Sequence, residues 1–349
     1  MKKIFALLLI LALLGGCAAQ PTAPPESEAP TPSSEPETFS DPESEPFSEP
    51  DVYEPTPYEY TWQPYVYSSV FREVHGEETE QAFYAMVDAV LSGAETFPCP
   101  SADTLHTLLM ISQTCFPPFP YLVDSFDWSD GQGYLYYAGD EQARQDILVY
   151  FQVSVWDIIV SAQLAEGDDE VTKAISLYST YSARVTYDYA AAEDNITVPD
   201  VSSYRALTED IGICQSFASA YAYLCLQCGV DAIPTGGMSD TQAHEWTLLK
   251  LDGEYYYADP TFENGDGGVG LCYFGMTAEK REQAGGFYAD NYNIGNTNLL
   301  FGRDIDVTDT RFAPLWEAVY LQGIYREETQ TRIVYLLNTG EEHEFIIPK

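Results

Sequence analysis

The chain has 349 residues, and its 55 acidic side chains outnumber its 15 lysines and arginines, which gives a formal net charge of −40. So few cations exclude nucleic-acid-binding proteins, which draw most of their affinity from Lys and Arg contacts with phosphate groups. A basic surface for anionic lipid is excluded for the same reason. Because 45% of the residues are hydrophobic and only 20% are charged, most of the chain is still expected to fold.

The N-terminus has the pattern of an export signal. Lys2 and Lys3 precede an apolar run of eleven residues at 4–14, which is too short to span a bilayer and suits a signal peptide. The run ends in Leu-Gly-Gly-Cys17, which resembles the lipobox of bacterial lipoproteins. This resemblance implies a signal peptide at 1–16, a diacylglycerol group on Cys17 and a lipid-anchored protein on the extracytoplasmic face of the cell membrane. The alternative is an ordinary secretory signal with an incidental cysteine.

Residues 17–64 are predicted to form a disordered acidic tether. Within it, residues 21–64 hold twelve of the 22 prolines and eleven acids but no Lys or Arg, a composition that favours an extended spacer over a core. Residues 65–349 still carry 13 basic and 44 acidic residues, a net charge of −31. Such a field would favour cationic peptides or amine donors, or it reflects only a solvated acidic surface.

The folded part is expected to begin with an N-terminal α/β region at residues 65–165. Helical spacing predicts helices at 79–92, ending at Gly93, and at 101–113. Residues 134–137 and 147–155 have the pattern of strands, and the second of these could continue into a helix. A helix at 168–183 and a polar loop at 190–206 follow, and residues 301–349 are predicted to form a C-terminal β segment, with strands at 332–337 and 344–347.

Six cysteines remain if Cys17 carries lipid. Cys99 and Cys115 flank the helix predicted at 101–113 and could form a disulfide in an exported chain. Cys225 and Cys228 have CxxC spacing but lie inside a helical pattern. No second CxxC or histidine pair accompanies them, so we interpret them as small core residues and predict no metal site.

Cys214 has a different setting. Starting from it, Phe217, Tyr221, Leu224 and Cys228 recur at helical spacing, and a glycine follows at 229, the residue type typical of a helix end. Cys214 therefore lies in the first turn of an amphipathic helix, where unpaired backbone N–H groups and the helix dipole favour a thiolate.

A hairpin downstream of this helix supplies a candidate base. Residues 244–251 have the pattern of a strand, Asp-Gly at 252–253 is a two-residue turn signal, and residues 254–258 return. This register places Trp246 opposite Asp259 and makes His244 and Asp259 diagonal neighbours on one face, within side-chain reach. The proline at 260 ends the returning strand. Asp259 could then orient the His244 ring, whose other nitrogen could take the proton of Cys214.

These segments together resemble the transglutaminase-like superfamily. The resemblance covers about residues 170–280 and rests on Gly-Ile-Cys214-Gln-Ser-Phe, on His244-Glu-Trp246 and on Tyr-Tyr-Ala-Asp259-Pro-Thr. It implies an α+β fold with a papain-like transglutaminase core at 166–300, in which a helix bearing the cysteine packs on an antiparallel sheet. It also implies a Cys214–His244–Asp259 triad in this chain order.

The predicted chemistry is acyl transfer through a thioester on Cys214, acting on protein or peptide amide bonds. The Cys214 backbone N–H is expected to be one oxyanion donor, with Tyr187 and Gln215 as further oxyanion or substrate candidates and Trp246 as a possible wall of the site. Tyr187 and Trp246 could equally be packing residues. No cofactor is expected, and the protein is expected to be a monomer. The alternative is a non-catalytic peptide- or wall-binding lipoprotein with the same fold.

Overall fold

The computed structural model describes residues 53–193, 201–288 and 305–349. The predicted signal peptide, Cys17 and the predicted tether up to residue 52 lie outside the described residues. The end of the predicted tether, at residues 53–64, is not a free spacer, because Tyr60 and Trp62 pack against the core and donate hydrogen bonds of 2.7 Å to Gln227 and Tyr223. None of the helices in the described ranges is long and apolar enough to cross a membrane.

The N-terminal region packs short helices on a small antiparallel sheet with the strand order β1-β3-β2. Its elements are α1 (Ser69–His75), α2 (Glu77–Ser92), β1 (Thr96–Pro98), α3 (Ala102–Cys115), α4 (Phe119–Leu122), β2 (Val123–Ser129) and β3 (Gln132–Tyr137). The two helices predicted here are confirmed as α2 and α3. Gly93 ends α2 in the left-handed conformation, with φ at 72°, which glycine adopts without steric cost.

The prediction of a strand at residues 147–155 is wrong, because these residues lie inside the long helix α5 (Glu141–Ser161). Asp140 starts the helix by accepting a hydrogen bond from the backbone N–H of Ala143. Apolar residues occupy both sides of α5 and so produce the unbroken apolar run that resembles a strand. The buried side carries Leu148, Phe151, Val155 and Ile158, and the exposed side carries Val149, Val153, Trp156 and Val160.

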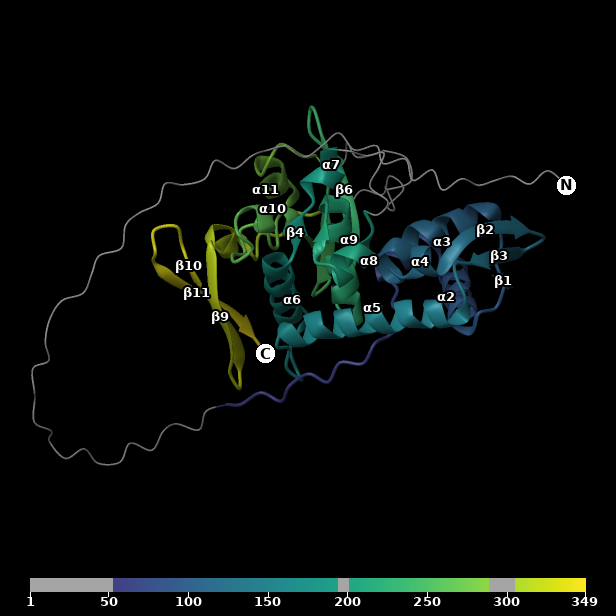
Figure 1. The fold of residues 1–349 in the computed structure, drawn as a ribbon. Coiled ribbons are helices and arrows are strands. Elements are labelled where there is room, and N and C mark those ends of the chain that lie inside the picture. The colour runs from purple at the N-terminus through teal and green to yellow at the C-terminus, as the bar shows by residue number, and fades with distance from the viewer. Residues whose placement is uncertain (1–52, 194–200, 289–304) are drawn as a thin grey trace, which may run out of the picture.

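The centre of the molecule is a three-stranded antiparallel sheet with two helices on one face (Figure 1). The helices are α6 (Glu170–Arg184) and α9 (Cys214–Gln227), and the strands are β6 (Asp231–Met238), β7 (Ala243–Leu251) and β8 (Glu254–Ala258). The predicted hairpin register is confirmed, with Leu251 opposite Glu254. Positive φ angles at Asp252 and Gly253 match the predicted turn. The α+β fold class is therefore confirmed.

Short elements connect α6 to α9 and follow the hairpin. They are β4 (Thr186–Tyr187), α7 (Tyr189–Glu193), α8 (Ser203–Thr208), β5 (Ile211–Gly212), α10 (Pro260–Gly265) and α11 (Ala278–Gln283). The polar loop expected at 190–206 therefore contains helical residues at both ends, while its part at 194–200 lies outside the described residues. The helix α8 has Ser202 as its N-cap and buries Leu207, but six residues are too few to show a helical period.

The C-terminal segment forms a separate antiparallel sheet, with the strand order β11-β10-β9. Its elements are the 3₁₀ helix η3 (Ala313–Glu317), β9 (Tyr320–Arg326), β10 (Gln330–Leu336) and β11 (Glu342–Pro348). The two strands predicted here are confirmed as β10 and β11. A buried ion pair, in which Arg326 contacts both oxygens of Asp168 at 2.8 Å, ties this sheet to the loop before α6.

Both faces of the central sheet are buried, and different parts of the chain cover them. Leu249 and Leu251 belong to a core shared with α5, α6, α9 and the C-terminal sheet. Trp246 and Leu248, on the opposite face, belong to a core shared with the N-terminal region. The N-terminal region is thus packed directly against the strand face that carries Trp246. The sequence did not predict where this region packs.

The six cysteines in the described part of the chain are all thiols. The disulfide considered between Cys99 and Cys115 is therefore not formed, and both side chains are buried in the N-terminal core. Cys225, in α9, and Cys228, directly after its last residue, are buried in the core, as predicted for small packing residues.

Candidate functional site

Cys214 is the first residue of α9, as predicted. Ile213 precedes it as the N-cap with an extended backbone, and Ser216 accepts a hydrogen bond from the Ile213 N–H while donating one to the Val201 carbonyl. Gly212 is needed here because a Cβ atom would lie 2.7 Å from Cβ of Ser216. These contacts hold the start of the helix in place. Only 2% of Cys214 is exposed.

The connections of α9 bring its start to the level of the start of β7. A tight turn leads from the end of α9 into β6, whose first residue, Asp231, pairs with Lys250 near the end of β7, so α9 and β7 run in the same direction. From there α9 extends back about 20 Å to Cys214 at 1.5 Å per residue, and β7 extends back about 20 Å to His244. A hydrogen bond of 3.0 Å from Thr247 Oγ1 to the Ala218 carbonyl ties the two elements together.

His244 and Asp259 form the contact that the hairpin register predicts. His244 Nε2 lies 2.7 Å from Asp259 Oδ2, and both side chains are completely buried. The regular ladder ends at the Thr247–Ala258 pair, one residue before Asp259. Because Nε2 faces the carboxylate, Nδ1 is the ring nitrogen that would exchange a proton with Cys214.

Asp259 is fixed by the start of α10 as well as by His244. Its Oδ1 accepts hydrogen bonds from the backbone N–H groups of Thr261, at 3.0 Å, and Phe262, at 3.1 Å, so it is the N-cap of α10. Pro260 occupies the first position of that helix, where its missing N–H costs nothing. Burial raises the pKa of the Asp259 carboxyl, but the positive charges of His244 and Arg281 outweigh burial, and the pKa lies below its ordinary value.

The three other candidates from the sequence lie around this site in different ways. The Tyr187 backbone pairs with Gly212, and the Tyr187 ring contacts Phe217 in the first turn of α9. The Gln215 side chain donates to Gln113 Oε1 at 3.3 Å and so joins α9 to α3. Trp246 is fully buried, with its ring centroid 5.8 Å from that of His244. Tyr187 and Trp246 thus adjoin the triad elements, while the Gln215 amide contacts the N-terminal region.

Three further residues belong to the site and were not predicted from the sequence. Arg281, in α11, donates from Nη1 to Asp259 Oδ2 at 2.6 Å, and it is fully buried. The rings of Phe262 and Phe287 lie 5.0 and 4.9 Å from the His244 ring, measured between centroids. The Asp-Pro pair at 259–260 is an N-cap signature that predicts a helix containing Phe262, but no spacing in the sequence indicated Arg281 or Phe287.

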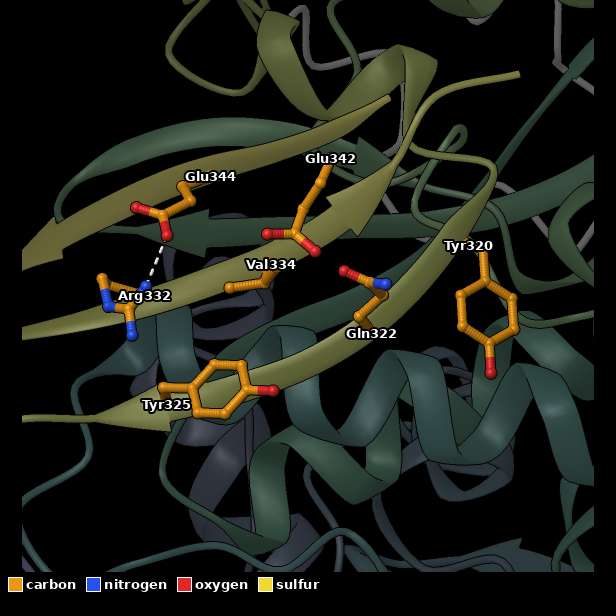
Figure 2. A pocket seen from close by; sticks show the side chains of 7 residues that line it. All are labelled: Tyr320, Gln322, Tyr325, Arg332, Val334, Glu342 and Glu344. Atoms are coloured by element: carbon orange, nitrogen blue, oxygen red, sulfur yellow. Dashed lines mark hydrogen bonds and ion pairs between the residues drawn. The ribbon is translucent and has the colours of Figure 1, made fainter. Parts of the chain in front are cut away.

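A hollow lies on the C-terminal sheet, and its lining includes none of Cys214, His244 and Asp259 (Figure 2). It has a volume of about 520 Å³. Its lining contains no cysteine, histidine or serine, and consists of Tyr320, Gln322, Tyr325, Arg332, Val334, Glu342 and Glu344. The Arg332 guanidinium is paired with Glu327 and Glu344. The hollow therefore offers neither a thiol nor an imidazole base, and the candidate site is the one around Cys214, His244 and Asp259.

The model of the transglutaminase-like superfamily matches residues 159–260. This segment is a transglutaminase-like core. The match spans less than a third of the chain and contains Cys214, His244 and Asp259, but ends before Arg281. No protein of curated function matches the chain significantly.

Solved structures resemble parts of the chain at low identity. One is described as a TGase, with 15% identity, a TM-score of 0.29 and coverage of 39% of this chain and 43% of the solved one. Another is a candidate cysteine protease from Cytophaga hutchinsonii, with 18% identity, a TM-score of 0.26 and coverage of 33% and 42%. The chain thus spans less than half the length of either structure, and these scores carry no argument about activity.

Proposed function

We propose that this chain is a thiol enzyme that acts on protein or peptide amide bonds through a thioester on Cys214. The observation that carries the proposal is the buried hydrogen bond between His244 Nε2 and Asp259 Oδ2, beside a helix that begins with Cys214. The transglutaminase-like core supports the same reaction class. A module that only binds peptides would not need a nucleophile, a base and a carboxylate that orients the base.

In the proposed reaction, His244 Nδ1 takes the proton of the Cys214 thiol, and the thiolate attacks the carbonyl carbon of the amide. The C–N bond then breaks, and the imidazolium gives its proton to the departing amine or ammonia. Water or a second amine attacks the thioester and forms an acid or a new amide, which regenerates the thiol. We expect the backbone N–H of Cys214, at the start of α9, to donate to the oxyanion.

We further propose that the enzyme works at the outer surface of the cell membrane, held by lipid on Cys17 and carried away from the bilayer by its acidic tether. The lipobox-like sequence before Cys17 supports this location. The full chain, expressed in a bacterium with a radiolabelled fatty acid, should incorporate the label and partition into the detergent phase. The Cys17→Ala chain should do neither, and equal labelling of both chains would refute lipidation at this residue.

The activity can be tested with a glutamine-rich protein and a dansylated amine, measuring fluorophore incorporation, ammonia release and peptide cleavage in one reaction. Incorporation would identify acyl transfer to an amine, and release without incorporation would identify hydrolysis. Cys214→Ala should abolish either product. Cys225→Ala is the matched control, because it removes a buried thiol from the same helix and should leave turnover unchanged.

Turnover that persists in Cys214→Ala would refute the thioester. A wild-type chain that forms no product and whose Cys214 reacts with iodoacetamide no faster than an ordinary thiol would instead support the non-catalytic binding protein.

A further inference from the structure

Arg281 is a buried cation at the proposed catalytic site. Its guanidinium donates from Nη1 to Asp259 Oδ2 at 2.6 Å, and this is the same oxygen that lies 2.7 Å from His244 Nε2. One carboxylate oxygen therefore serves two cationic partners, the imidazole and the guanidinium. Arg is almost never buried without a charged partner, so the pairing with Asp259 explains how Arg281 is accommodated.

Further contacts hold the guanidinium in a fixed position. Its Nη2 donates to the Ala284 carbonyl at 2.8 Å. Its Cζ lies 4.4 to 5.5 Å from the centroids of three aromatic rings, those of Phe262, Trp246 and Phe287. The His244 ring packs against the same three rings. Arg281 and His244 thus share one aromatic enclosure, where charges interact more strongly than in water.

The charge of Arg281 alters what Asp259 can do for His244. A carboxylate alone would stabilise the imidazolium strongly, whereas a carboxylate that also pairs with a guanidinium exerts a weaker net field on the ring. Two further titratable groups lie close by, on α6 and α10. The Tyr178 hydroxyl donates hydrogen bonds of 3.1 Å to the Asp259 backbone carbonyl and to Glu263 Oε2. Burial raises the pKa of Glu263 to about 7.

We propose that Arg281 is a positioning residue of this site, which holds the Asp259 carboxylate against His244 and offsets part of its charge. The inference rests on the proposed function. Its consequence is that His244 releases its proton at a lower pH than a His–Asp pair without the arginine would. The imidazole therefore remains able to accept a proton from Cys214 at neutral pH.

The test is the pH dependence of Cys214 alkylation by iodoacetamide, measured by mass spectrometry. Its basic limb reports loss of the His244 proton beside the thiolate. A unit charge about 5 Å away, at an effective dielectric constant of about 20, accounts for a shift of up to roughly two and a half pH units. Arg281→Met should move the limb upward by at least about one unit. Arg281→Lys keeps the charge and should leave the limb near its wild-type position.

A double substitution separates positioning from a structural role. Asp259→Asn with Arg281→Met removes both charges, so neither is left buried and unpaired. Its limb should lie at least about one unit above that of Asp259→Asn alone, because the guanidinium charge that remains in the single variant still acts on the His244 ring. If Arg281→Met fails to fold, the comparison of Asp259→Asn with the double variant still tests the effect of Arg281.

An unchanged limb in folded Arg281→Met, or coincident limbs in Asp259→Asn and the double variant, would overturn the inference. A wild-type profile without any His244-dependent limb would refute the proposed function itself, so the two failures are distinguishable.

Discussion

Replacing Asp259 by asparagine should destabilise the folded protein strongly, because the carboxylate is completely buried and has four partners. Its Oδ2 contacts His244 and Arg281, and its Oδ1 caps α10 through the N–H groups of Thr261 and Phe262. The asparagine carbonyl can keep the cap. What it cannot replace is the negative charge opposite Arg281, which would remain buried as a cation without a counterion.

Removing one partner of a buried ion pair costs about 3–5 kcal/mol, and losing an N-cap costs about 1 kcal/mol more. We therefore expect Asp259→Asn to lower the free energy of unfolding by about 3 kcal/mol or more, and Asp259→Ala to lower it by about 1 kcal/mol beyond that. Because the folded-state pKa of Asp259 is depressed, its contribution is complete above the unfolded pKa of about 3.9 and is lost as the pH falls through the folded value.

Urea unfolding at neutral pH, with an unchanged slope between variants, measures these differences directly. Asp259→Asn combined with Arg281→Met should recover much of the loss, because the pair is replaced by two neutral side chains. An Asp259→Asn protein within about 1 kcal/mol of wild type would refute the buried pairing of Asp259 with Arg281.

Two further predictions concern residues that surround the triad. Burial raises the pKa of Glu263 to about 7, so the folded acid holds its proton where the unfolded one has lost it, and stability should fall as pH rises from about 4.5 to 7. The free energy of unfolding of Glu263→Gln should accordingly exceed that of wild type by up to about 3 kcal/mol at pH 8 and be close to it near pH 5. Gly237→Ala should cost about 1–3 kcal/mol, because its Cβ would lie 2.5 Å from the Tyr288 carbonyl oxygen and 2.6 Å from the Trp246 ring.

Urea unfolding at the two pH values tests the first of these predictions, and an effect of Glu263→Gln that is the same at both would contradict it. For the second, Gly265→Ala is the matched control, since nothing lies within 4 Å of the Cβ it would introduce. Equal stability of Gly237→Ala and Gly265→Ala would show that β6, the strand on which Gly237 pairs with His244 of β7, is less tightly packed than described.

The contact between His244 and Asp259 could be predicted from the sequence because a two-residue turn fixes strand register. Once Asp252 and Gly253 are at the turn, every cross-strand neighbour follows by counting. The position of Cys214 was predictable for a similar reason, since the helical period and the closing glycine define where α9 starts and ends.

Arg281 could not be predicted, because its contact with Asp259 depends on how α11 folds back over the sheet, and no local pattern encodes that path. The error at residues 147–155 has another cause. Apolar side chains on the exposed side of α5, such as Val153 and Trp156, mask the helical period that the buried Phe151 and Val155 would have revealed. Local periodicity identifies elements only where one side of the element is polar.

We propose that His244 and Asp259 activate Cys214 as a nucleophile. The decisive measurement is the rate of Cys214 alkylation as a function of pH, in wild type and in His244→Ala. Wild-type Cys214 should react as a thiolate well below the ordinary thiol pKa of about 8.5, and His244→Ala should lose this reactivity at neutral pH. The same profile in both proteins, rising near pH 8.5, would contradict it.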